Sequence, residues 1–264
     1  MARKPDWVVE KERARREGPA PVWLFGLHAV RDALLNPART RLRLILTLNA
    51  RQRLGEEAIE AGGLEPEIAD PRRFPAPLDP QSVHQGAALE VAPLDWGPLE
   101  EVCAPQGGSD LVVLLDRVTD PHNVGAILRS AEVFGARAVI APLRHSAPET
   151  GALAKTASGA LERQPYLRVK NLGAAMETLK TLGYACIGLD GLGDADLAEA
   201  AQALPDRPLA LVRGAEGPGL RDKTRGLCDR IARIPSAAEF ASLNVSNAAA
   251  VALYAARSTR ARPL

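Results

Sequence analysis

The sequence predicts an α/β fold: an open, mostly parallel sheet with helices on both faces, preceded by a small α/β domain. From Leu111 onward, short apolar runs alternate with segments of helical periodicity, the order typical of parallel strands joined by helical crossovers. The run Leu111–Leu115 is apolar at every position, as expected for a central strand buried on both faces. Residues 94–110 are rich in Pro and Gly and separate this pattern from a shorter one before it.

The N-terminal part of the chain shows the shorter α/β pattern. Residues 1–20 hold many charged and few apolar side chains, so we expect a flexible arm. Residues 21–93 are expected to form the small domain, and residues 94–110 a linker. Within this domain the patterns predict a helix over 28–35, a strand over 42–48, a short helix over 55–61, a brief strand near Ile68 and a strand over 87–91.

Residues 111–264 are expected to form the larger domain. The patterns predict strands over 111–115, 137–141, 166–169, 185–189, 209–212 and 230–234, and helices over 123–134, 152–162, 172–182, 220–228 and 245–258. Open parallel sheets bind their ligands beyond the carboxyl ends of the strands. We therefore looked for chemistry in the loops that follow Leu115, Val212 and Ile234.

Composition and charge restrict the classes of function. The net charge of +1 does not by itself indicate a nucleic-acid-binding protein. The longest apolar run, Ala248–Ala256, is too short to span a bilayer, and residues 1–20 lack the apolar stretch of a signal peptide. The three cysteines (Cys103, Cys186 and Cys228) are scattered and, with the four histidines, give no metal-ligand spacing. We therefore expect a cytoplasmic protein with reduced thiols and no bound metal.

The loop after Leu115 carries polar residues at the start of a predicted helix. Asp120 can cap the helix and Pro121 suits its first turn. Asn123 follows in the first turn, and Arg129 lies about two turns into the helix. A surface arginine in a salt bridge explains Arg129 equally well from spacing alone.

The loop after Val212 is rich in glycine. Gly214, Gly217 and Gly219 fall within six residues and let the backbone approach a ligand closely. Glu216 is the only acid among them. An ordinary strand-to-helix turn is the alternative interpretation.

The third loop leads into a helix of small residues. Asn244 and Ser246 can each cap this helix, whose free N–H groups also suit a polar ligand. The alanines of residues 248–256 allow another backbone to come close, so the helix is a possible subunit contact. A further glycine-rich segment, Gly188–Asp194, imitates a dinucleotide-binding turn, but its spacing is wrong and we interpret it as an ordinary loop.

Taken together, the three loops resemble the signature motifs of the SpoU (TrmH-like) family of RNA ribose 2′-O-methyltransferases, over nearly all of residues 111–257. The resemblance rests on Asp120–Ala131 (DPHNVGAILRSA), on Gly214–Gly219 (GAEGPG), and on Ile234-Pro235 with Ser242–Ser246 (SLNVS). In the N-terminal part, Phe25–Val30 and Val83–Gly86 are similar to the subgroup that methylates a guanosine of 23S ribosomal RNA.

The resemblance implies an S-adenosylmethionine (SAM)-dependent enzyme of the SPOUT superfamily that needs no metal. Its C-terminal chain would be threaded into a deep trefoil knot, and the knotted domain would form a homodimer. The implied catalytic residues are Asn123, Arg129, Glu216, Ser242 and Asn244, and the implied cofactor-binding residues are Gly214, Glu216, Gly217, Ile234 and Leu243.

The resemblance also implies that the N-terminal domain helps to hold ribosomal RNA. Between Asn36 and Gly55 the chain has no acid, and it contains Arg39, Arg41 and Arg43. We expect these three residues, with His84 and Arg129, to contact the RNA, although a solvated surface of mixed charge is the alternative. A tRNA 2′-O-methyltransferase and a catalytically silent RNA-binding relative remain alternatives for the whole chain.

Overall fold

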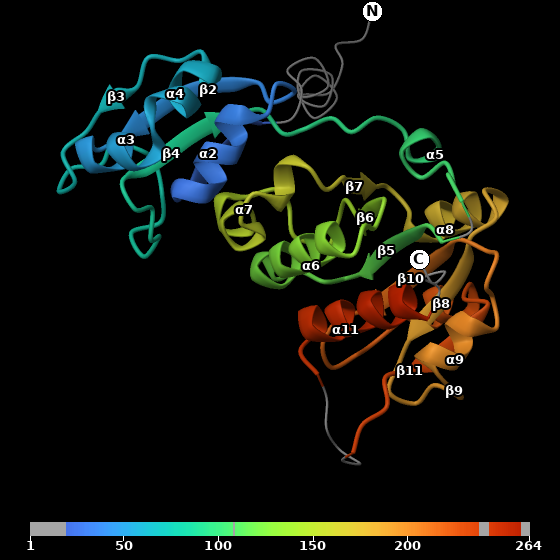
Figure 1. Cartoon of the computed structure of the whole chain (residues 1–264). Coiled ribbons are helices and arrows are strands. Elements are labelled where there is room, and N and C mark those ends of the chain that lie inside the picture. The colour runs from blue at the N-terminus through green and yellow to red at the C-terminus, as the bar shows by residue number, and fades with distance from the viewer. Residues whose placement is uncertain (1–19, 108, 238–242, 260–264) are drawn as a thin grey trace, which may run out of the picture. The chain divides into compact units, whose positions relative to one another are not determined.

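The computed structural model describes residues 20–107, 109–237 and 243–259 (Figure 1). The chain divides into two compact units between Asp95 and Trp96. No helix in these described ranges is both long and apolar enough to cross a membrane.

The first unit contains a four-stranded sheet in the order β1-β4-β2-β3. Strands β1 and β2 pair antiparallel with β4, and β3 pairs parallel with β2. The elements are β1 (Val22–Phe25), α2 (Leu27–Leu35), β2 (Arg41–Leu46), α3 (Leu48–Leu54), α4 (Glu56–Gly62), β3 (Glu67–Ile68) and β4 (Ala87–Val91). The predicted strand over 42–48 ends earlier than expected, because the Thr47 hydroxyl accepts a hydrogen bond from the Ala50 N–H at 3.2 Å and caps a helix that we did not predict.

The second unit contains a seven-stranded sheet in the order β7-β6-β5-β10-β8-β11-β9. Every pair of neighbouring strands is parallel, which confirms the predicted type of sheet. The strands are β5 (Leu111–Asp116), β6 (Ala138–Pro142), β7 (Tyr166–Val169), β8 (Ala185–Leu189), β9 (Ala195–Asp196), β10 (Leu209–Gly214) and β11 (Arg230–Arg233). All six residues of β5 are buried, as its apolar sequence predicts.

The helices of this unit differ from the prediction at several places. They are α5 (Leu99–Val102), α6 (Pro121–Val133), α7 (Gly151–Ala157), the 3₁₀ turn η1 (Ala160–Glu162), α8 (Leu172–Thr181), α9 (Leu197–Gln202), α10 (Asp222–Gly226) and α11 (Val245–Ser258). The predicted helix over 152–162 is interrupted because Ser158 and Gly159 adopt left-handed conformations, at φ 51° and 90°. Helix α9 was not predicted, and it is held by burial of Leu197, Ala200 and Ala201.

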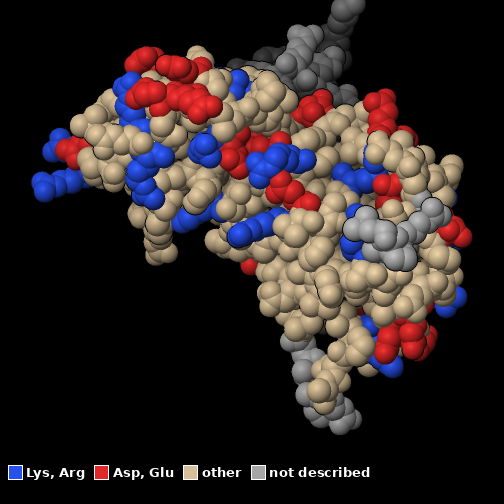
Figure 2. All heavy atoms as spheres, in the orientation of Figure 1, with Lys and Arg blue, Asp and Glu red and all other residues tan. Residues whose placement is uncertain are grey.

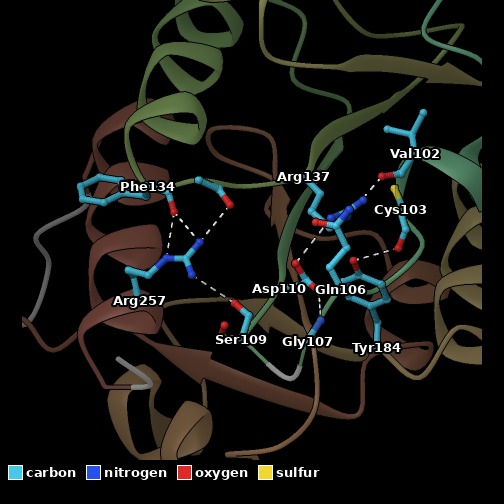
Figure 3. A network of polar contacts seen from close by, with 11 residues as sticks. Val102, Cys103, Gln106, Gly107, Ser109, Asp110, Phe134, Arg137, Tyr184 and Arg257 are labelled. Carbon is cyan, nitrogen blue, oxygen red and sulfur yellow. Dashed lines mark hydrogen bonds and ion pairs between the residues drawn. The ribbon is translucent and has the colours of Figure 1, made fainter. Parts of the chain in front are cut away.

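Part of the predicted linker belongs to the second unit. Trp96, Leu99 and Val102 pack against a buried cluster that α8 shares with strands β5, β6, β8 and β10. The Tyr184 hydroxyl donates to the Cys103 carbonyl at 3.0 Å, and Arg137 Nε donates to the Val102 carbonyl at 3.2 Å (Figure 3). Residues 96–103 are therefore fixed onto the sheet rather than spanning freely between the units.

The last helix is anchored at its C-terminal end. Helix α11 packs against α6, α9 and β10 (Figure 1). The guanidinium of Arg257 donates to the carbonyls of Phe134 (2.7 and 2.9 Å) and Gly135 (2.9 Å), which directly follow α6, and to the Ser109 carbonyl (3.3 Å) (Figure 3). These bonds fix the C-terminal end of α11 to the end of α6.

Candidate functional site

The glycine-rich loop after β10 is a tight, closed structure. The Gly219 N–H donates to the Ala215 carbonyl at 3.1 Å, and Gly217 and Gly219 have φ values of 82° and 68°. A Cβ placed on Gly214 would lie 2.1 Å from the Gly219 carbonyl group, so no side chain fits there. The three glycines thus allow the loop to fold back on itself and carry Glu216 at its tip.

An ion pair with a buried carboxylate holds this loop against the neighbouring strand. Gly214 and Asp116 are register partners at the ends of β10 and β5. The carboxylate of Asp116 is fully buried and receives Arg221 Nε at 2.8 Å and Nη2 at 2.7 Å. Because Arg221 follows the loop directly, the pair fixes both of its ends.

Glu216 connects this loop to the start of α11. Its Oε1 accepts hydrogen bonds from Asn244 Nδ2 at 2.7 Å and from the Val245 N–H at 3.1 Å. The second of these is one of the free N–H groups of the helix start, where a carboxylate is also favoured by the helix dipole.

Asn244 joins all three predicted motifs. Its Oδ1 caps α11 by accepting the Ser246 N–H at 2.9 Å, and its Nδ2 also donates to Asn123 Oδ1 at 3.0 Å. Asn123 stands in the first turn of α6, which Asp120 caps by accepting the His122 N–H at 2.9 Å. The capping signals that were read from the sequence thus position the side chains of the site.

Among the predicted catalytic residues that the structure describes, Arg129 makes no hydrogen bond to this cluster. Arg129 is exposed on α6, six residues after Asn123 and therefore about 9 Å further along the axis. Its guanidinium has no hydrogen-bond or ion-pair partner among the residues that the structure describes. Ser242 lies outside the described residues.

A cavity of about 400 Å³ lies beside the cluster, a size suited to a small ligand. Its walls are mostly apolar, and Ile234, Pro235, Leu243 and Ala248 contribute to them. A more polar cavity shares several of its residues and reaches Glu216, Gly217 and Asn244. Four of the five predicted cofactor-binding residues therefore line these cavities, and Gly214 lies between two residues, Arg213 and Ala215, that do.

The sequence analysis missed one wall of the cavity. Leu189, Asp190 and Gly191 line both cavities, although Gly188–Asp194 was interpreted as an ordinary loop. Strand β8 is paired with β10, so the loop after β8 must lie beside the loop after β10. The rule that ligands bind at the carboxyl ends of strands could have found this loop. Among the described residues there is no group of three potential metal ligands.

The predicted RNA-binding arginines of the first unit have structural partners. Arg39 is 2% exposed and donates to the Ala92 carbonyl at 2.9 Å, so it is not available to a phosphate. Arg41 donates to the Leu34 carbonyl at 2.6 Å. Arg43 pairs with Glu67 at 2.6 Å but keeps 45% of its side chain exposed. On the face shown in Figure 2, basic and acidic side chains are intermixed.

His84 is a partly buried residue with defined contacts. Its ring stacks on Phe74 with centroids 4.2 Å apart, and its Nδ1 accepts the Gly86 N–H at 3.1 Å. Burial lowers the pKa of His84, which favours the neutral ring at neutral pH. His84 is thus suited to stacking and hydrogen bonding rather than to carrying a charge.

Two known proteins are similar in sequence to this chain over most of its length. The 23S rRNA (guanosine-2′-O-)-methyltransferase RlmB of Ralstonia nicotianae is 39% identical over 237 residues, covering 88% of this chain and 94% of that protein. An uncharacterized tRNA/rRNA methyltransferase of Synechocystis is 37% identical over 243 residues, and the match covers 88% of this chain but only 61% of that protein's length.

A solved structure shares the fold over both units. The crystal structure of the SpoU methyltransferase AviRb from Streptomyces viridochromogenes in complex with the cofactor AdoMet has a TM-score of 0.77 at 25% identity, and the match covers 95% of this chain and 94% of that one. Residues 110–254, which contain all three motifs, match the SpoU rRNA Methylase family. The chain therefore belongs to the SpoU rRNA methylase family.

Proposed function

We propose that this protein transfers a methyl group from SAM to the ribose 2′-hydroxyl of a guanosine in 23S ribosomal RNA. The observation that carries the proposal is the meeting of Asn123, Glu216 and Asn244, from three separate motifs, at the edge of the cavity. Family membership supports the type of reaction, and the similarity to RlmB supports the nucleotide and the RNA. The cytoplasm, where ribosomal RNA is modified in bacteria, is the compartment that this substrate implies.

The residues of the cavity fit SAM. The apolar walls at Ile234, Leu243 and Ala248 suit an adenine ring, and the polar side at Asp190 and Glu216 suits the charged methionyl part. The buried Nε of Arg213 lacks a hydrogen-bond partner within the described chain, and such a donor is suited to an anionic ligand group. When bound, SAM supplies a methyl group activated by a sulfonium. No residue of the protein needs to carry the methyl group during the transfer.

The chain's own task is to align the hydroxyl and to stabilise its negative charge as the proton leaves. A guanidinium is effectively always protonated in proteins, so Arg129 is unsuited to be the base. We infer that Arg129 binds the neighbouring phosphate and stabilises the developing alkoxide, while water or another group takes the proton. Asn123, Ser242 and Asn244 would orient the ribose and Arg129. Glu216 accepts hydrogen bonds from Asn244 and Val245 and so holds the glycine-rich loop against the start of α11.

We propose that the RNA is also held by the first unit. Arg43 and His84 are the predicted contacts that remain accessible to it, Arg43 through its half-exposed guanidinium and His84 through its stacked ring. Arg41 would contribute only if its bonds to main-chain carbonyls were exchanged for a phosphate.

We further propose a homodimer through the second unit. Val251 and Tyr254 of α11 are 41% and 62% exposed, and Val133 of the neighbouring α6 is 70% exposed. These apolar side chains lie on adjacent helices, and Tyr254 contacts Phe134 edge to face. A second copy would remove them from water. The trefoil knot that the family resemblance implies stays a prediction.

The function is tested by mapping 2′-O-methyl groups on cellular RNA in strains with and without the gene. We expect one guanosine of 23S RNA to lose its methyl group in the deletion strain and to regain it with the wild-type gene but not with an Arg129→Ala variant. Purified protein should methylate a 23S transcript in preference to tRNA. Loss of a tRNA site instead would make the protein a tRNA methyltransferase. Unchanged methylation would favour a silent RNA-binding relative.

A further inference from the structure

One charged side chain of the cavity has no assigned role. Arg213, near the end of β10, lines both cavities together with Asp190. Its Nη1 donates to the Leu189 carbonyl at a long distance of 3.3 Å. Its Nε is buried without a hydrogen-bond partner, and no ion pair engages the guanidinium within the described part of the chain. A half-buried cation with an unused N–H donor is unfavourable unless a further group satisfies it.

The two acids near Arg213, Asp190 and Glu216, form their ion pair and hydrogen bonds with other residues. Asp190 forms an ion pair with Arg225 and accepts the Leu192 N–H at 2.9 Å. Glu216 accepts two hydrogen bonds from the start of α11. Burial lowers the pKa of Arg213, and both acids act in the opposite direction without touching it. The charge of Arg213 is therefore compensated only at a distance, and an anion brought in by a ligand would meet it directly.

SAM carries one anionic group, the α-carboxylate of its methionyl part. A carboxylate matches the two parallel N–H groups on the Nε side of a guanidinium, which is the side that Arg213 does not use. We propose that Arg213 binds the α-carboxylate of SAM and thereby selects the intact cofactor over forms that lack this group. Because the Nε is closed off from solvent, this binding requires the guanidinium to turn toward the carboxylate. The inference rests on the proposed function.

The test compares two ligands that differ only in the carboxylate: S-adenosylhomocysteine and its decarboxylated form, S-adenosyl-3-thiopropylamine. Titration calorimetry gives both dissociation constants for the wild type and for Arg213→Met. We expect the wild type to prefer S-adenosylhomocysteine on the order of 10- to 100-fold, the range for a hydrogen bond between charged groups. Arg213→Met should abolish that preference by weakening S-adenosylhomocysteine alone. Arg213→Lys, which keeps the charge but not the fork, should retain part of it.

Arg233→Met is the matched control. Arg233 lies on the neighbouring β11, pairs with Asp196 at 3.0 Å and does not line the cavities, so its removal should leave both affinities unchanged. Equal weakening of both ligands by Arg213→Met, or no change in either, would overturn the carboxylate assignment while SAM binding stands. A wild type that binds neither ligand would overturn the proposed function itself. If Arg213→Met does not fold, the Arg213→Lys comparison decides the matter on the same two ligands.

Discussion

At the scale of a single residue, Asn244 contributes to the stability of α11 and to the candidate site through different side-chain atoms. Its Oδ1 caps α11, whereas its Nδ2 donates to Glu216 and Asn123. In Asn244→Asp the cap is kept, because Asp caps helices as well as Asn does. The donor is lost and a carboxylate faces Glu216. We expect methyl transfer to fall about 10- to 100-fold, and the free energy of unfolding to fall by about 1–3 kcal/mol because the hydrogen bond to Glu216 is lost, while the cap of α11 is kept.

Initial rates with a labelled methyl donor and urea unfolding curves measure these two effects. Asn171→Asp is the control, because Asn171 caps α8 by accepting the Ala174 N–H at 3.3 Å and lies outside the candidate site. That variant should be neutral in both measurements. An active Asn244→Asp enzyme would remove Asn244 from the set of functional donors.

A substitution at Arg129 tests whether methyl transfer needs the planar guanidinium or only a positive charge. The side chain is exposed on α6, where the described residues offer it no competing partner. If it binds phosphate and stabilises the alkoxide, Arg129→Lys should lower the single-turnover rate on the order of 10²–10³-fold and leave SAM affinity unchanged. A near-normal rate in Arg129→Lys would mean that a positive charge alone is sufficient.

At the scale of elements, the closed glycine loop is the part least able to accept a side chain. A Cβ on Gly214 would collide with the backbone of Gly219, at 2.1 Å, so Gly214→Ala must open the loop that presents Glu216. We expect binding of S-adenosylhomocysteine to fall at least about tenfold and the free energy of unfolding to fall by about 1–3 kcal/mol. Gly226→Ala is the control, since nothing lies within 4 Å of its added Cβ, and it should be neutral or slightly stabilising. Normal binding by Gly214→Ala would show that the loop is not part of the cofactor site.

At the scale of the whole molecule, the exposed apolar stripe of α11 predicts the oligomeric state. Val251→Glu with Tyr254→Glu places two charges in the proposed contact and should convert a dimer into a monomer in analytical ultracentrifugation. Leu48→Glu changes an apolar side chain of the first unit that is 67% exposed, more than Val251 or Tyr254, and should leave the mass unchanged. A wild type that is monomeric at micromolar concentration would contradict the proposed interface.

Buried thiols predict how stability depends on pH. Burial raises the pKa of Cys103 and of Cys186 to about 12, and that of Cys228 to about 11. The unfolded chain loses these protons near pH 8.5, whereas the folded chain keeps them. The free energy of unfolding should therefore fall as the pH rises from about 9 to 11, by at most about 1.4 kcal/mol per pH unit for each thiol. Urea unfolding at pH 7, 9 and 10 measures this decline, and Cys186→Ala should reduce its slope. An unchanged slope in Cys186→Ala would mean that this thiol is not protected in the fold.

The sequence by itself determined the local structure of the site. The caps Asp120 and Asn244 and the glycines of the loop after β10 act through neighbours within a few residues, so their effect can be read from spacing. Apolar runs placed the central strands within one or two residues of the observed bounds, because burial on both faces requires an unbroken run.

Only the tertiary structure decided what lies beside what. The burial of Arg39 depends on which side chain of a basic stretch turns inward. The cavity wall at Asp190 and the Nε of Arg213, unpaired among the described residues, depend on which strands pair. Strand order is fixed by contacts between residues far apart in the chain, such as β5 with β10, and no local signal encodes them. The structure likewise joined Asn123, Glu216 and Asn244 into one cluster, because hydrogen bonds across 28 and 121 residues form only once the sheet has brought the loops together.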